Sequence, residues 1–374
     1  MNQTLLRVGV TGTGSFLPNA PITNDQIDNV LGRITDAPPR VLGFIESVGK
    51  RMLDHGGVQR RHFAVDPETH ELTHNLATLA EPAARRALEA AGREPGDVDL
   101  LLFSSPSYDQ TTPPTSTTLQ EKLGIERCAE MEIHSNCAGV GKMVQVAYDA
   151  LRLGRYRTAL IVYSQLSSVY LRAQYFNQAK MTKTQAALRY ILADGSAALL
   201  LESAPPESPP PHEVLGAYVE SIGGKRPPGM TAGGGVADVG AGADPICGVH
   251  LRGAHHLDQD FAAVNRDAAA LLLEGVCRML ESLRVDPASC DHFIGSVPTM
   301  QLYGDNLARF QERLNVGPER LKFRATDVGY VGGTSILLHL DDMVRSGELR
   351  PGQTAVLHSV ESSKWMSAGF IVRW

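Results

Sequence analysis

The sequence predicts an α/β fold built from two similar halves. Short runs of β-branched residues and leucine alternate with segments of helical apolar period, as in folds whose central strands are buried between helices. A Pro-rich stretch, APPESPPPH at 204–212, separates a first series of such elements from a second. With 374 residues, 43% of them hydrophobic, the chain is long enough for two lobes or one large α/β domain. We expect the halves at 1–203 and 204–374.

The elements follow in order along each half. In the first half the pattern predicts strands at 6–11, 98–104, 131–137, 158–164 and 197–202, with helices at 76–91 and 141–152. In the second half it predicts a strand near 214–219, a helix at 260–283, a strand at 292–297, a helix at 306–314, and a final pair at 335–345 and 354–359. The Gly- and Pro-rich segment 223–244 lacks apolar periodicity, so we expect a long loop over the joint between the halves.

Composition excludes several function classes. The 35 basic and 41 acidic residues give a net charge of −6, without a polybasic field for nucleic acid. The five cysteines include no C-x-x-C pair, so they encode neither a disulfide framework nor a zinc cluster. No run reaches the roughly 18 apolar residues that a bilayer span needs, and the N-terminus lacks the pattern of a signal peptide. We expect a soluble, unprocessed, cytoplasmic protein that binds neither nucleic acid nor membrane.

Two further motifs fall short of ligand sites. Gly12 and Gly14 in TGTGS follow the first predicted strand, but the third glycine of a dinucleotide-binding motif is missing and SFLPN is expected to turn. His255 and His256, with Asp258, lack further ligands at a spacing that suits a metal ion. We therefore expect no cofactor and no metal ion.

Cys137 is the chemically most informative residue. It lies in MEIHSNCAGVGKMVQVAYDALRLGRY, where a predicted strand meets the start of a predicted helix. A thiol at a helix N-terminus faces unpaired N–H groups and the positive end of the helix dipole, which lowers the thiol pKa. The small neighbours Ala138 and Gly139 admit a substrate carbonyl, and the Cys137 N–H can help to hold an oxyanion. Cys137 is thus a candidate nucleophile, and the alternative is a buried, inert cysteine.

Several segments together resemble β-ketoacyl-(acyl carrier protein) synthase III. They are VGVTGTGSFLPNAPITNDQID, GVQRRHF, TLAEPAARRALEAAGREPGDVDLLLFSSPS, NCAGV, ADGSAALLLE and GGTSILLHLDDMVRSGELRPGQTAVL. The resemblance runs from about residue 5 to the C-terminus and is weakest across 205–258. It implies a thiolase fold of αβαβα layers with two topologically similar halves, usually a homodimer with the active site between the halves. In this chain the acyl-accepting cysteine of the family falls on Cys137.

The sequence departs from the family at three places. The family stabilises the enolate left by malonyl decarboxylation with a histidine after Val-Pro and an asparagine in Gly-Asn-Thr-Ser. Here these positions read Thr299 and Gly333, or in an alternative register Ser296 takes the place of the histidine. The Gly-rich C-terminal loop that donates an N–H to the oxyanion hole reads ESSK at 361–364. Ser363 can still donate its N–H, although side chains would narrow the pocket there.

These departures favour acyl transfer over condensation. Some relatives of the family are acyltransferases of secondary metabolism, which move an acyl group from a carrier protein or coenzyme A to a hydroxyl or amine. Transfer requires a nucleophile, an oxyanion hole and a base for the acceptor. His134 and His358 are candidate bases, although each can instead be a partly buried histidine bonded to backbone. Asp327 is a weaker candidate in a turn, and an amine acceptor would need no base.

The leading hypothesis is a dimeric acyltransferase that forms a thioester on Cys137 and passes the acyl group to an O or N acceptor. The second is an atypical enzyme that forms a carbon–carbon bond without decarboxylation. The third is a catalytically silent partner subunit.

A basic cluster is predicted near the donor. Lys50, Arg51, Arg60 and Arg61 lie where the resemblance places the mouth of the pantetheine tunnel. They are expected either to attract a coenzyme A phosphate or an acidic carrier protein, or to form a solvated basic face.

Overall fold

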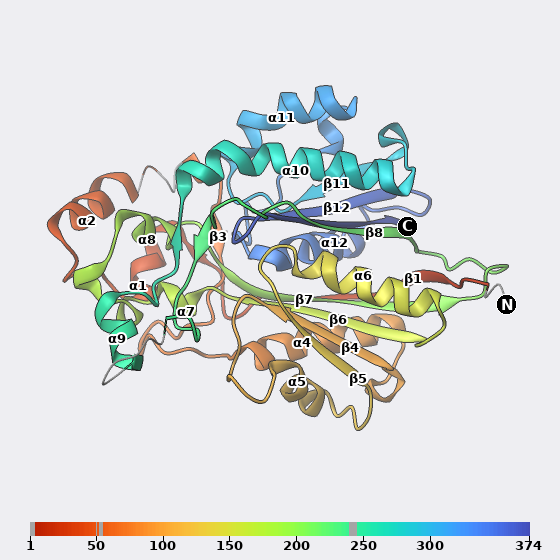
Figure 1. Ribbon diagram of the computed structural model, residues 1–374, viewed down its shortest axis with the longest axis horizontal. Helices are drawn as coiled ribbons and strands as arrows, with labels where there is room; N and C mark the ends of the chain where they lie inside the picture. The colour runs from red at the N-terminus through yellow and green to blue at the C-terminus, as the bar shows by residue number, and fades with distance from the viewer. Residues whose placement is uncertain (1–3, 50, 52–54, 239–244) are drawn as a thin grey trace.

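A computed structural model describes residues 4–49, 51, 55–238 and 245–374. Its helices and strands are stacked in five layers, and Figure 1 shows the middle helices α6 and α12 between two layers of strands. Helices α4 and α5 cover one outer face, while α10 and α11 cover the other. The expected αβαβα layering is therefore confirmed. The main helices are α4 (Leu76–Ala91), α5 (Thr115–Leu123), α6 (Gly139–Arg152), α10 (Phe261–Leu283), α11 (Met300–Leu314) and α12 (Ser335–Arg345).

The main strands form one hydrogen-bonded series in the order β11-β12-β13-β8-β1-β7-β6-β4-β5. At its middle, β1 and β8 are joined at one pair, Gly9 with Glu213. Strands of the first half of the chain lie on one side of this join, and strands of the second half lie on the other. The division into two domains stays a prediction. The bounds are β1 (Arg7–Phe16), β4 (Leu100–Ser105), β5 (Ala129–His134), β6 (Thr158–Leu166), β7 (Asp194–Ala204), β8 (Glu213–Ser221), β11 (His292–Gly295), β12 (Thr354–Glu361) and β13 (Met366–Arg373).

The core lies on both faces of the strands. Every residue of β4 and of β6 is buried, because helices cover the sheet on either side and parallel strands in such sheets are near-continuous apolar runs. Helix α6 lies between strands of both halves, since it contacts β6 and β4 of the first half and β8 and β13 of the second. The helix that begins beside Cys137 is therefore held by both halves.

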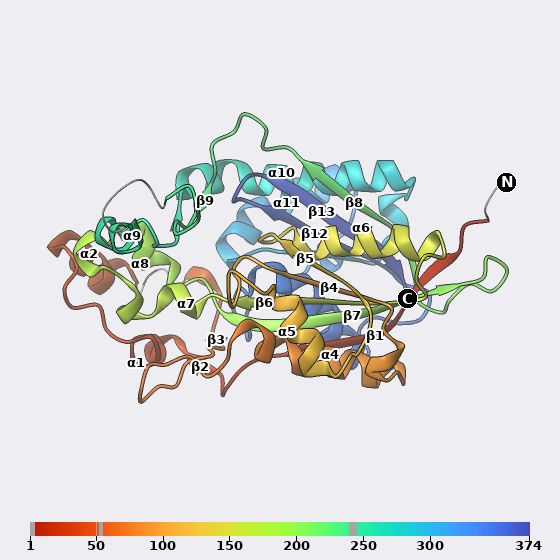
Figure 2. The same ribbon diagram turned by 60° about the horizontal axis from the view of Figure 1, so that its bottom comes forward.

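Short elements gather at one end of the molecule, opposite the C-terminus (Figures 1 and 2). They come from the connections between the main strands and cover the end of the sheets from which Cys137 projects. Among the described residues, no helix is both long and apolar enough to span a membrane. The short elements are β2 (Ile22–Thr23), α1 (Ile27–Leu31), α2 (Pro39–Phe44), β3 (Arg60–Arg61), α7 (Ser168–Leu171), α8 (Lys183–Leu188), β9 (Met230–Thr231), α9 (Pro245–Arg252) and β10 (Asp258–Gln259).

The predicted elements are largely confirmed, with differences at their ends. The helices at 76–91 and 335–345 have the predicted bounds, whereas the helix expected at 306–314 begins at Met300 and the strand expected at 131–137 ends at His134. Strand β13 and helix α5 were absent from the prediction. The segment 223–244 contains the short strand β9, which pairs with β10, and residues 239–244 lie outside the described part of the chain.

The turn expected at SFLPN is wrong at its start, because β1 continues to Phe16. Gly12 and Gly14 lie within this strand, directly beneath α4. A Cβ at Gly12 would lie 2.0 Å from the Ala87 oxygen, and one at Gly14 would lie 2.3 Å from the Ala83 oxygen. The two glycines therefore allow the helix to approach the strand closely.

We expect Gly141→Ala to destabilise the fold through the contact between α6 and β13. A Cβ at Gly141 would lie 2.6 Å from the Ala368 Cβ and 2.7 Å from the Gly369 nitrogen. Overpacking of this kind lowers the free energy of unfolding by about 1–3 kcal/mol, which urea denaturation measures. The control is Gly43→Ala in α2, where an added Cβ meets nothing within 4 Å and no loss of stability is expected. Equal stability of Gly141→Ala and wild type would contradict the close packing.

Candidate active site

Cys137 lies in the turn between β5 and α6, where it is partly buried. The turn is held from below by Tyr163 of β6, whose hydroxyl lies 3.1 Å from the Ser135 carbonyl oxygen and 3.0 Å from that of Asn136. Tyr163 is fully buried, so water does not compete for these hydrogen bonds. The predicted strand-to-helix position of Cys137 is confirmed.

The Cys137 side chain faces a cavity of about 470 Å³, within the size range of small-molecule sites. Residues of both halves line it, including Leu188 and Leu192 from the first half and Leu272 and Phe310 from the second. Polar groups gather near the cysteine, and the space between α10 and α11 is apolar. The cavity thus has the composition expected for an apolar chain that reacts at one end.

Two hydroxyl groups lie beside the sulfur. The Tyr330 hydroxyl is 3.1 Å from the Cys137 Sγ, and the Ser296 Oγ is 3.2 Å from the Tyr330 hydroxyl and from the Gly332 carbonyl oxygen. Within the described part of the chain, neither an imidazole nor a carboxamide hydrogen-bonds to Sγ. The sequence analysis missed Tyr330, because nothing in TDVGYVGG distinguishes this tyrosine from one in the core.

Glu361 places a buried carboxylate at the start of α6. Its Oε2 accepts hydrogen bonds from the Ser135 hydroxyl at 2.6 Å and the Ala138 N–H at 3.2 Å, and its Oε1 accepts from the Ser363 hydroxyl. The Lys142 ammonium donates to the same Ser135 oxygen at 2.8 Å. The positive end of the α6 dipole therefore already has an anionic partner. The only indication of this buried carboxylate in the sequence was the acidic residue of the altered ESSK loop.

The expected lowering of the Cys137 pKa is wrong. Burial raises the pKa of the thiol to about 11, the hydrogen bond from Tyr330 opposes this rise, and the charge of Glu361 adds to it. The helix terminus does not compensate because Glu361 occupies it. Burial also raises the pKa of both Tyr330 and Tyr163 well above the usual value, so both phenols are protonated at neutral pH. Cys137 is a thiol at neutral pH and must lose its proton as it reacts.

Thr299, Ser296 and Gly333, the residues expected at the histidine and asparagine positions of the family, do not all face the cavity near Cys137. Thr299 lines the cavity, but its Oγ1 accepts the Leu302 N–H at 3.2 Å and caps α11. Ser296, the alternative, is the residue that bonds to Tyr330. Gly333 was expected in the pocket, but its backbone packs against the Tyr163 ring, where a Cβ would lie 2.6 Å from the ring Cζ. The neighbouring Gly332 lines the cavity in its place.

The candidate bases lie in unequal positions. His358 of β12 is buried at the cavity wall with its Nε2 3.0 Å from the Ser367 Oγ. Burial, followed by the charge of Arg278, lowers the pKa of His358 to about 3, so it is a weak base at neutral pH. His134 lines the cavity and is exposed, and its imidazole has no hydrogen bond to any described residue. Asp327 is exposed in a turn, as expected.

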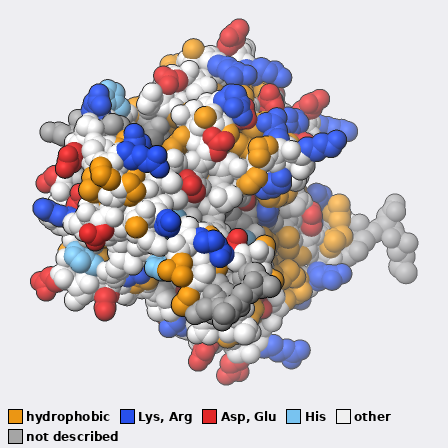
Figure 3. Space-filling model, turned by 60° about the vertical axis from the view of Figure 1, so that its left-hand side comes forward, with side chains coloured by type: hydrophobic (Ala, Val, Ile, Leu, Met, Phe, Trp, Pro, Cys, Tyr) orange, Lys and Arg blue, Asp and Glu red, His pale blue; other side chains and the backbone are white. Residues whose placement is uncertain are grey.

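The basic cluster is dispersed. Arg51 is exposed, Arg60 forms an ion pair with Asp327 at 2.7 Å, and Lys50 lies outside the described residues. The expectation that Arg61 faces a ligand at the surface is wrong, because its side chain is fully buried and burial lowers its pKa to about 10. Figure 3 shows basic and acidic side chains interspersed over this end of the molecule.

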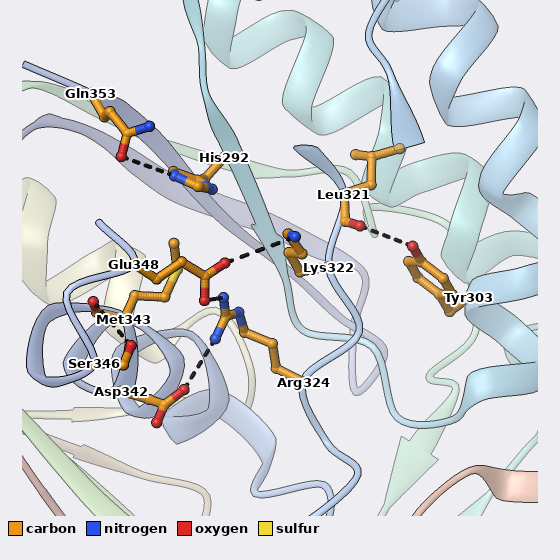
Figure 4. A network of polar contacts seen from close by, with 10 residues as sticks. All are labelled: His292, Tyr303, Leu321, Lys322, Arg324, Asp342, Met343, Ser346, Glu348 and Gln353. Carbon is orange, nitrogen blue, oxygen red and sulfur yellow. Dashed lines mark hydrogen bonds and ion pairs between the residues drawn. The ribbon is translucent and has the colours of Figure 1, made fainter. Parts of the chain in front are cut away.

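A polar network fixes the segment that leads to Tyr330 (Figure 4). The Tyr303 hydroxyl of α11 donates to the Leu321 carbonyl oxygen at 2.9 Å. Three residues further, Arg324 bonds to Asp342 in the last turn of α12 at 3.1 Å and to Glu348 in the segment after this helix. The chain that carries Tyr330 is therefore attached to a helix on either side of the second sheet.

Known proteins share this architecture. No family model matches the chain. Its sequence is similar to β-ketoacyl-(acyl carrier protein) synthase III of Methylococcus capsulatus, with 24% identity over 350 residues and 94% of each chain covered. The solved structure of AbyA1, described as a tetronic acid condensing enzyme, matches with a TM-score of 0.77 and 24% identity, covering 98% of this chain and 100% of that one.

Two further structures extend the comparison. Synthase III from Pseudomonas aeruginosa matches with a TM-score of 0.74 and 21% identity over 98% of each chain. OleA from Xanthomonas campestris matches with a TM-score of 0.76 and 16% identity, covering 100% of this chain and 99% of that one. The five layers and these structural matches show that the chain has a thiolase fold. In sequence, the chain is similar to a β-ketoacyl-(acyl carrier protein) synthase III.

We expect substitutions at Tyr330 and Glu361 to shift the Cys137 pKa in opposite directions. Tyr330→Phe removes a hydrogen bond that stabilises the thiolate, so the pKa rises further. Glu361→Gln removes a nearby negative charge, so the pKa falls. A change of one pKa unit alters the thiolate fraction about tenfold. Alkylation of Cys137 by iodoacetamide, followed by peptide mass spectrometry, should therefore be slower in Tyr330→Phe and faster in Glu361→Gln.

Cys247 is the internal reference for this measurement, because it is exposed and does not line the cavity. Its alkylation rate should be the same in all three proteins. A shift of the Cys137 rate in the same direction in both variants would contradict the assigned electrostatics.

Proposed function

We propose that the protein is an acyltransferase, which accepts an acyl group on Cys137 and passes it to an oxygen or nitrogen nucleophile in a biosynthetic pathway. The observation that carries this proposal is the set of groups around the sulfur, which comprises two hydroxyls and the Glu361 carboxylate. Decarboxylative condensation brings a second carboxylate, that of a malonyl donor, and then an enolate into the same space. A buried anion disfavours both by charge repulsion.

The transfer consists of two balanced steps. The Cys137 sulfur attacks the donor thioester, a new sulfur–acyl bond forms, and the donor leaves as a thiol with the proton that Cys137 gives up. The acceptor then attacks the Cys137 thioester, its proton is transferred, and the free thiol is regenerated. Backbone N–H groups of Cys137 and Ser363 are the proposed oxyanion donors. The Tyr330 hydroxyl, 3.1 Å from the sulfur, supports the thiolate whenever it forms.

The proposed donor is an acyl thioester of acyl carrier protein or of coenzyme A. Support comes from the names of the relatives, which act on acyl carrier protein, and from the apolar cavity beside Cys137. A cytoplasmic location stays a prediction.

We further propose that the protein is a homodimer. Strand β5, which leads to Cys137, is at the edge of the sheet, and Met131 on it is 42% exposed. Unpaired strand edges of this kind are available to a second chain.

Carbon–carbon bond formation is the second candidate, because one observation favours it. The hydroxyls of Tyr330 and Ser296 are hydrogen-bond donors next to the sulfur, and such donors can also hold an enolate oxygen. Release of carbon dioxide or a β-keto product from a malonyl donor would support condensation. A product acylated on oxygen or nitrogen supports transfer, and a product acylated on carbon supports condensation, with or without loss of carbon dioxide.

Incubation with a panel of acyl-coenzyme A and acyl-carrier-protein donors tests the thioester. We expect added mass on the intact wild-type protein and none on Cys137→Ala, because the intermediate is covalent. The added mass identifies the acyl group. The matched control is Cys128→Ala, since Cys128 lies outside the cavity, and this variant should be acylated like wild type. Absence of an adduct with every donor would contradict transfer and condensation through Cys137 and favour a silent partner subunit.

A further inference from the structure

The transfer step requires a base that the sequence-predicted candidates do not supply. A hydroxyl acceptor must give up its proton as its oxygen attacks the thioester. His358 has a pKa of about 3, and its Nε2 already contacts the Ser367 hydroxyl. His134 is exposed, and its imidazole is not hydrogen-bonded to any described residue. A group that is buried, ordered and next to Cys137 would suit the role better.

Glu361 meets these conditions. Only 5% of it is exposed, it lines the same cavity as Cys137, and it is held by residues on either side of Cys137 in the chain, Ser135 and Ala138. Its Oε2 takes both of these hydrogen bonds. Its Oε1 accepts, among the described residues, from the Ser363 hydroxyl alone. A carboxylate oxygen has about two acceptor positions, so Oε1 retains one for an acceptor hydroxyl.

The surrounding charges suit an ionised carboxylate. The Lys142 ammonium reaches Glu361 through a single hydroxyl, that of Ser135, and so offsets the cost of burying a negative charge. The other titratable groups that face the carboxylate are Cys137, Tyr163 and Tyr330. Burial raises the pKa of each, so they are neutral at neutral pH.

We propose that Glu361 is the general base that activates the acceptor, and that the acceptor is an uncharged hydroxyl compound. This inference rests on the proposed acyl transfer. Glu361 takes the proton from the acceptor as the new carbon–oxygen bond forms. The carbon–sulfur bond then breaks, and the proton passes from Glu361 to the Cys137 sulfur, which restores the thiol and the carboxylate. An anionic acceptor is disfavoured by the carboxylate, and an amine acceptor would not require the base.

The buried thiol makes this proton return useful. Thiols with a high pKa leave slowly as thiolates, and the pKa of Cys137 is raised to about 11. A proton delivered to the sulfur as it departs removes that disadvantage. The same carboxylate that makes Cys137 hard to ionise can thus assist its release.

The test compares acylated wild type with acylated Glu361→Gln. Both proteins are first loaded with the donor that labels wild type, and the loss of the adduct is followed by intact mass after 1-butanol or hydroxylamine is added. Butanol needs a base, whereas hydroxylamine attacks thioesters without one. We expect Glu361→Gln to accept the acyl group, to lose it to butanol about 100-fold more slowly, and to lose it to hydroxylamine within about twofold of the wild-type rate.

Alkylation of Cys137 provides a second measurement. Glu361→Gln should also show the faster alkylation of Cys137 expected above, because the negative charge beside the thiol is removed. A purely structural loss would not raise thiol reactivity while it slows transfer.

The matched control is Glu132→Gln. Glu132 likewise accepts a backbone N–H at the start of a helix, that of Ser116 in α5 at 3.1 Å, but it does not line the cavity. This variant should transfer to butanol and hydroxylamine at wild-type rates. If Glu361→Gln does not fold, Glu361→Asp is used in its place, and a loss greater for butanol than for hydroxylamine is expected.

Each outcome has a separate meaning. An equal loss with butanol and hydroxylamine, or no loss with either, overturns the role of Glu361 while acyl transfer stands. Failure of folded Glu361→Gln to accept the acyl group also overturns it, because the carboxylate would then act in the first step. If wild type itself forms no adduct, the proposed function fails.

Discussion

The hydrogen bonds between Glu361 and the Cys137 turn are the constraint on which the site depends. Glu361 ends β12 of the second half, and its two partners, Ser135 and Ala138, belong to the first. The start of a helix leaves N–H groups without intrahelical partners, and here a carboxylate from the other half satisfies one of them. The position of Cys137, the proposed nucleophile, is therefore set by contact between the halves. Tyr163 completes the support from beneath.

This arrangement keeps the sulfur neutral. Burial and the carboxylate keep Cys137 protonated, and the Tyr330 hydroxyl offsets only part of that effect. Such a thiol resists chance oxidation and alkylation, since the thiolate is the reactive form. In the proposed reaction, the Cys137 thiol gives up its proton only when a substrate in the cavity can accept it. Hydrogen bonds of Arg324 and Tyr303 anchor the segment that leads to Tyr330, and this helps to fix the Tyr330 hydroxyl beside the sulfur.

Much of the fold could be predicted from the sequence, because the spacing of apolar residues in a long segment indicates both its secondary structure and its buried face. Helices α4 and α12 have their predicted bounds, and α10 differs only at its cap, Asp260. Helix α11 begins early because the Thr299 side chain caps it, a local contact that apolar spacing does not show. The cysteine turn could also be found. Its electrostatics could not, because Glu361 lies more than two hundred positions along the chain and a helix terminus considered alone indicates the opposite pKa shift.

The packing of Gly333 against Tyr163 restricts how this chain can change over generations. A side chain at position 333 would collide with the tyrosine ring, and the same ring holds the turn of the nucleophile through its hydroxyl. An asparagine at 333 therefore needs a smaller residue at 163, and a smaller residue at 163 loosens the turn. We therefore expect each substitution alone to be costly, so that the residue acceptable at either position depends on the residue at the other.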